Sequence, residues 1–89
     1  MTLMEAIKSH RENVIDIREI DEVAVKGIVG VRNVPMMGLM MNPEQFMNKE
    51  ETYYLMCASG GRVSAAIAEL EPLGYKLENI GGIMHYEGE

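Results

Sequence analysis

Residues 52–70 predict a strand, a tight loop and a helix in direct succession. The run 52–56 is apolar, aromatic and β-rich, and it is short enough to be a buried strand. Apolar residues at positions 63, 66, 67 and 70 have the spacing of one helix face. Six residues join the two elements: Cys57, Ala58, Ser59, Gly60, Gly61 and Arg62. A link this short must turn the chain sharply where the strand ends.

Strands and helices alternate along the rest of the chain. We expect a first helix over 3–9, opened by a capping box that starts at Thr2. The other expected elements are a strand over 14–17, a helical piece around 21–24, a strand over 31–34, a helix starting at 42–43 and a final strand over 75–80. Gly81 and Gly82 are expected to form a turn. The alternation predicts one α/β domain over 1–89, with a central, mainly parallel sheet between helical layers.

Cys57 is the only cysteine of the chain and a candidate nucleophile. The first N–H groups of a helix have no partner within the helix, and the helix dipole adds partial positive charge there, so a thiolate at the loop entrance is stabilised. Gly60 and Gly61 would let the loop curl with its amides turned inward. Arg62 would close the cradle with a permanent positive charge.

Two further polar residues follow a predicted strand. Asp16 and Arg18 lie at or just beyond the end of the strand over 14–17, as Cys57 does for the next one. In parallel sheets, ligands bind at the carboxyl ends of the strands, so these residues could converge on one edge. We interpret Asp16 and Arg18 as supporting residues that pair with each other or bond loop amides.

Composition narrows the function classes. The net charge is −6 and no cluster of lysines or arginines occurs, so the electrostatic footprint of a nucleic-acid binder is missing. No apolar run approaches the roughly 20 residues that span a bilayer, and no signal-peptide pattern is present. A lone thiol suits a reducing compartment, so we expect a cytoplasmic protein. His10 and His85 are isolated, and neither a metal nor a cofactor is predicted.

Several segments, in order, resemble the rhodanese family of single-domain sulfurtransferases. Residues 14–19 resemble its early strand and Asp-x-Arg segment, and residues 21–23 resemble the acidic turn that follows. Cys57-x-x-Gly60-x-Arg62 resembles the active-site loop. Residues 73–75 and 81–83 resemble the later Leu-Gly-Tyr and Gly-Gly-Ile signatures. The stretch 26–31 departs from the family, because it lacks the usual histidine.

The resemblance implies a rhodanese-like α/β/α fold and a sulfur-transfer reaction. Cys57 would attack the outer sulfur of a donor and carry that sulfur as a persulfide to an acceptor. The amides of residues 58–62 would stabilise the terminal sulfur. The implied partners are a small-molecule donor, such as thiosulfate or a persulfide, and a thiol or cyanide-like acceptor, with a protein persulfide as a further candidate. Since Arg62 is the only cation of the loop, a dianionic donor would receive limited charge compensation.

Two other readings use the same cysteine. Phosphatases and arsenate reductases also place a cysteine before a loop that ends in arginine, but with five intervening residues instead of the four found here. A ring of four suits a single sulfur better than a tetrahedral oxyanion. The non-enzymatic alternative is a redox-sensing or interaction module, in which an oxidised Cys57 needs an external thiol because no second cysteine is present.

Overall fold

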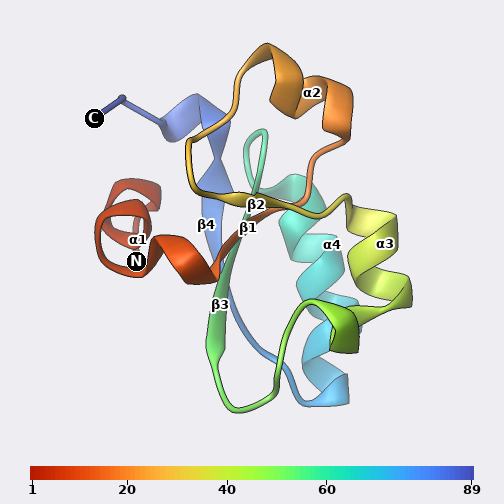
Figure 1. Cartoon of the computed structure of the whole chain (residues 1–89). Coiled ribbons are helices and arrows are strands. Elements are labelled where there is room, and N and C mark those ends of the chain that lie inside the picture. The colour runs from red at the N-terminus through yellow and green to blue at the C-terminus, as the bar shows by residue number, and fades with distance from the viewer.

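A four-stranded parallel sheet forms the centre of the protein. The structure is a computed structural model that describes residues 1–89. The strands are β1 (Val14–Asp16), β2 (Arg32–Asn33), β3 (Thr52–Cys57) and β4 (Lys76–Gly82), in the spatial order β2-β1-β3-β4 (Figure 1). All three neighbouring pairs are parallel, so the carboxyl ends of the strands lie at one edge. The structure confirms the predicted α/β class.

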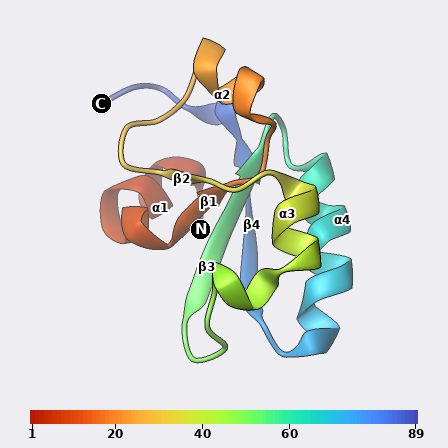
Figure 2. The same ribbon diagram turned by 45° about the vertical axis from the view of Figure 1, so that its right-hand side comes forward.

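Helices cover both faces of the sheet. Helix α1 (Leu3–His10) lies on one face, and α3 (Met36–Met41) and α4 (Gly61–Leu70) lie side by side on the other (Figures 1 and 2). The fourth helix, α2 (Ile20–Val25), buries no residue and lies beyond the carboxyl ends of the strands. Short 3-10 turns follow at Arg11–Asn13, Pro43–Gln45, Glu71–Leu73 and Ile83–His85. The predicted three layers are therefore present, with α2 placed outside them.

Two apolar clusters hold the layers together. The larger one joins the sheet to α3 and α4 and includes Ile15, Leu39, Leu55, Val63 and Leu70. The smaller one joins the opposite face to α1 and includes Leu3, Ile7, Val14, Tyr54 and Met56. Successive residues of β3 thus alternate between the two cores, as side chains do along any strand. A strand buried on both faces explains why residues 52–57 read as a continuous apolar run.

Local sequence signals explain several element boundaries. The Thr2 hydroxyl accepts a hydrogen bond from the Glu5 amide, and the Glu5 carboxylate accepts one from the Thr2 amide, so the predicted capping box opens α1. After α4, Gly74 adopts a left-handed conformation with φ of 103° and ends the helical path.

Three sequence expectations were wrong in detail. The sequence predicted no helix over 36–41, but α3 forms there because Met36, Leu39 and Met40 share one face that packs on the core. The helix expected at 42–43 is only a 3-10 turn over Pro43–Gln45. The turn expected at Gly81 and Gly82 is instead the end of β4, where a register shift brings Gly82 opposite Cys57.

Candidate active site

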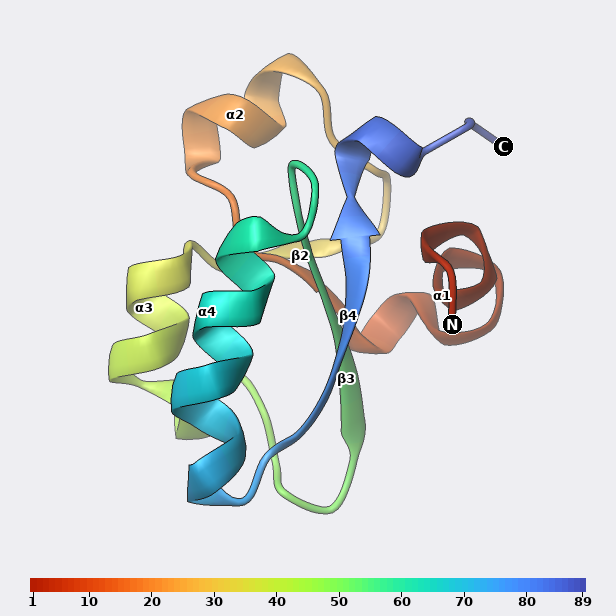
Figure 3. The same ribbon diagram turned by 180° about the vertical axis from the view of Figure 1, so that it is seen from behind.

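Cys57 is the last residue of β3, at the edge where the carboxyl ends of the strands meet. The chain then turns through residues 58–60 and enters α4 at Gly61. Figure 3 shows this turn beside the start of α4, at the same end of the sheet as α2. The loop is shorter than the sequence suggested, because Gly61 and Arg62 already belong to the first turn of the helix. The cysteine side chain is 1% exposed.

Backbone amides surround the sulfur of Cys57. The Gly60 N–H donates to Sγ at 3.1 Å. Burial raises the pKa of the Cys57 thiol, but the N–H groups of Val63, Gly60, Ser59 and Arg62 together lower it by more, so the pKa lies below that of an ordinary thiol. Sequence reasoning named the amides of all five residues 58–62; those of Ser59, Gly60 and Arg62 are among the groups that lower the pKa, those of Ala58 and Gly61 are not, and that of Val63 was missed. The arrangement favours a thiolate at the mouth of helix α4.

Of Gly60 and Gly61, only Gly60 has a backbone conformation that requires glycine. Gly60 has φ of 112°, a left-handed conformation that side chains disfavour. A Cβ there would also lie 3.1 Å from the Asn79 Oδ1. Gly61 has helical geometry, and a Cβ on it would meet no atom within 4 Å. The curl that points the amides at sulfur therefore depends on Gly60.

Asn79 on β4 anchors this curl, and sequence reasoning missed it. Its Nδ2 donates to the Gly60 carbonyl at 3.0 Å and to the Ser64 hydroxyl at 3.1 Å, while its Oδ1 accepts from the Gly81 amide at 2.9 Å. The Ser64 hydroxyl also donates to the Gly60 carbonyl, at 3.2 Å. A polar residue near the carboxyl end of a parallel strand was the available signal for Asn79.

The end of β4 packs directly against the loop from the other side. An added Cβ on Gly82 would lie 2.1 Å from the Cys57 carbonyl oxygen and 2.4 Å from the Ala58 carbonyl. The Met84 amide donates to the Ala58 carbonyl at 3.2 Å. Strand β4 and the turn after it therefore form one wall of the candidate site. The Ala58 carbonyl is thus bonded to this wall.

Arg62 forms an ion pair that the sequence did not indicate. Its two guanidinium NH2 groups donate to the two Glu22 carboxylate oxygens at 2.7 and 2.9 Å. The hydrogen bond from Arg62 is the largest cause that lowers the pKa of Glu22 to about 2, and Glu22 in turn raises the pKa of Arg62. The two residues are 40 positions apart, so only the placement of α2 above α4 brings them together.

Asp16 and Arg18 form a second pair, and both are buried. The Arg18 guanidinium donates to Asp16 Oδ2 at 2.7 Å and to the Lys26 carbonyl at 2.8 Å. Asn33 donates to the carbonyls of both Asp16 and Arg18. No hydrogen bond joins either residue to the loop over 58–62. Their contacts tie β1, β2 and the segment after α2 together.

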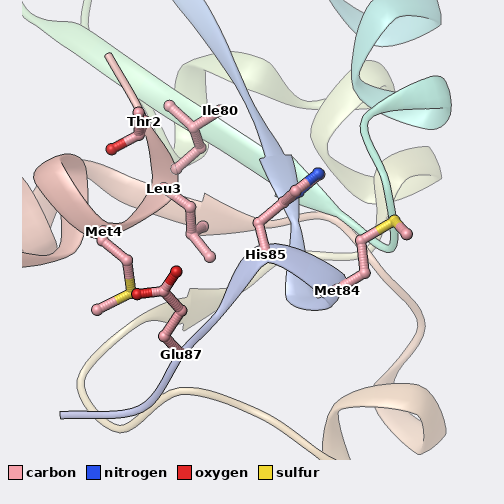
Figure 4. Close-up of a pocket in the computed structure, with 7 residues that line it drawn as sticks. All are labelled: Thr2, Leu3, Met4, Ile80, Met84, His85 and Glu87. Atoms are coloured by element: carbon pink, nitrogen blue, oxygen red, sulfur yellow. The ribbon is translucent and has the colours of Figure 1, made fainter.

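A separate cleft lies between α1 and the segment after β4. It has a volume of about 670 Å³, and its lining residues are drawn in Figure 4: Thr2, Leu3, Met4, Ile80, Met84, His85 and Glu87. None of them belongs to the Cys57 loop. No group of three or more His, Cys, Asp or Glu residues is placed to hold a metal ion. No helix is both long and apolar enough to cross a membrane.

The fold and the site together define a parallel α/β domain in which one cysteine, between a central strand and the helix that follows it, is stabilised as a thiolate by main-chain amides. The model of the rhodanese-like domain matches residues 2–88, and the chain belongs to that family.

Similar proteins agree with this assignment. A protein of Bacillus subtilis (strain 168) named "Putative sulfurtransferase YtwF" is 34% identical over 89 residues, which are 98% of this chain and 85% of that protein. The crystal structure of a rhodanese-like domain protein from Staphylococcus aureus has a TM-score of 0.78 and 30% identity, covering 98% of this chain and 85% of that one. SSP1007 from Staphylococcus saprophyticus has a TM-score of 0.76 and 33% identity, covering 90% and 81%.

Proposed function

We propose that this protein is a sulfurtransferase that carries sulfane sulfur as a persulfide on Cys57. The observation that carries the proposal is the position of the Cys57 sulfur at the start of α4, where the Gly60 N–H donates to it at 3.1 Å and the amides of Ser59, Arg62 and Val63 also help to lower its pKa. Such donors stabilise the thiolate before the reaction and the terminal sulfur of the persulfide after it. Membership of the rhodanese-like family and the name of the B. subtilis relative support the same chemistry.

The reaction proceeds as two displacements at sulfur. The Cys57 thiolate attacks the outer sulfur of the donor, a new S–S bond forms at Sγ, and the bond between the donor's two sulfurs breaks. The leaving group, sulfite from thiosulfate or a thiolate from a persulfide, departs with the electron pair. A thiolate or cyanide acceptor then attacks the outer sulfur of the persulfide and releases the Cys57 thiolate. The enzyme is unchanged at the end of the cycle.

The roles of the surrounding residues follow from their positions. The Gly60 amide and its neighbours would hold the anionic sulfur, and Arg62, in the first turn of α4, would carry its charge beside them. Ala58 and Gly61 are small and uncharged, so they would add no charge to the loop. Asp16 and Arg18 would support the edge of the sheet, and they form no hydrogen bond with the loop.

Intact mass spectrometry tests the proposal. After incubation with thiosulfate or glutathione persulfide, the protein should gain the mass of one sulfur atom, and the Cys57→Ser variant should gain none. A wild-type protein without an adduct, or an equal adduct on both proteins, contradicts the proposal. Multiple turnovers with cyanide, measured as thiocyanate, separate a transferase from a redox-sensing module, which would react once and stop.

A further inference from the structure

Glu22 forms a two-fold hydrogen-bonded ion pair with Arg62, the only cation of the Cys57 loop. We propose that this pairing makes the site selective for donors with at most one negative charge at the reacting group, such as organic persulfides and thiosulfonates, over dianions such as thiosulfate. The inference rests on the proposed sulfur transfer and adds a specificity-determining residue to it. Glu22 acts here through Arg62 and through its own field.

The loop that follows Cys57 contains one charged residue. Residues 58–61 carry no charge. Arg62 is the cation nearest to the sulfur in the loop, and both of its terminal nitrogens are held by Glu22. The pKa of Glu22 is about 2, so this carboxylate is ionised throughout the neutral range. The Arg62–Glu22 pair is therefore neutral as a whole.

Arg18, the cation just beyond the end of β1, cannot replace Arg62. Arg18 is 4% exposed, and its guanidinium is bound by the Asp16 carboxylate and the Lys26 carbonyl. The amides at the start of α4 already stabilise the one negative charge of the Cys57 thiolate. A dianionic donor would approach this thiolate with no positive charge left to offset the repulsion.

The surface beside the loop favours donors with an uncharged substituent. Met84, whose amide is bonded to Ala58, is 70% exposed. An organic substituent on the donor can contact the Met84 side chain, whereas a sulfonate group cannot use it.

Two donors of similar shape isolate the effect of charge. Thiosulfate carries two negative charges, and methanethiosulfonate carries one because a methyl group replaces one oxygen. Both transfer their outer sulfur to the Cys57 thiolate: the new S–S bond forms as the donor's bond between its two sulfurs breaks, and sulfite or methanesulfinate leaves with the electron pair. The measured quantity is the ratio of the two second-order rate constants for sulfur loading.

Glu22→Gln is the test variant, and Glu69→Gln is the matched control. Glu69 is an exposed residue of α4 that makes no hydrogen bond to the site, so its variant changes the net charge equally. Glu22→Gln should raise the rate constant for thiosulfate relative to methanethiosulfonate by about threefold to tenfold. Glu69→Gln should leave the ratio as it is in the wild type. An unchanged ratio in Glu22→Gln, or an equal change in both variants, overturns the inference.

The same measurements keep this inference apart from the proposed function. If neither donor loads sulfur on the wild type, the sulfurtransferase proposal itself fails. If both donors load sulfur but the ratio of their rate constants is the same in Glu22→Gln, only the proposed selectivity is rejected. If Glu22→Gln does not fold, the wild type alone still tests the inference. The ratio of its rate constant for methanethiosulfonate to that for thiosulfate is divided by the same ratio measured for a small thiolate in water, and the quotient should exceed one. A value of one or less overturns the inference.

Discussion

Replacement of Gly82 by alanine should separate β4 from the Cys57 loop. The Gly82 backbone is extended, with φ of −175°, so any residue could adopt it, and only the lack of space forbids a side chain. The added Cβ would lie 2.1 Å from the Cys57 carbonyl oxygen, whereas real Cβ atoms essentially never come within 3.0 Å of such an atom. Because backbone atoms lie on both sides of the overlap, strand and loop must move apart by roughly 1 Å.

This displacement should reduce both stability and activity. Overpacking of a close backbone contact costs about 3 kcal/mol, out of a total of about 4–13 kcal/mol for a domain of 89 residues. The melting temperature should fall by about 12–24 °C. In the molecules that remain folded, a shift of about 1 Å in the amides around sulfur should slow sulfur loading by up to about 100-fold.

Thermal unfolding and the rate of sulfur loading measure the two effects, with Gly38→Ala as the matched control. A Cβ on Gly38, inside α3, meets no atom within 4 Å, so this variant should be more stable by about 0.4–1 kcal/mol and load sulfur at the wild-type rate. A Gly82→Ala protein that melts within about 2 °C of the wild type and loads sulfur equally fast would refute the steric argument.

Two other predictions concern the loop. Because the pKa of Cys57 is lowered in the folded protein, its alkylation by iodoacetamide should titrate at lower pH than that of free cysteine. The free energy of unfolding, relative to that of Cys57→Ala, should rise with pH between the folded and the unfolded thiol pKa, and below the folded pKa the difference should not change with pH. An alkylation midpoint at or above that of free cysteine argues against stabilisation of the thiolate by the amides. Asn79→Ala removes the bond to the Gly60 carbonyl and should lower stability by about 1–2 kcal/mol and slow sulfur loading. The control variant Asn13→Ala removes a similar hydrogen bond at the opposite end of β3, so it should lower the stability but leave the rate of sulfur loading unchanged. Equal rates of sulfur loading in the two variants would show that Asn79 does not contribute to the site.

Local signals in the sequence were sufficient for most of the fold. The apolar run of β3, the capping box of α1 and the periodicity of α4 depend on near neighbours in the chain, so the alternating α/β order could be read from them. Helix α3 could not, because its short methionine-rich segment owes its helical form to the core on which Leu39 packs.

In the candidate site, too, some features depend on local sequence and others on tertiary contacts. The sequence alone determined that one cysteine would end a strand before a glycine turn and a helix, since residue type and spacing encode that step locally. Only the tertiary structure decided which groups surround it: Glu22 on Arg62, Asn79 on the Gly60 carbonyl and Gly82 against the Cys57 backbone. Each of these contacts joins residues at least 19 positions apart, so it exists only after the sheet has brought the strands together.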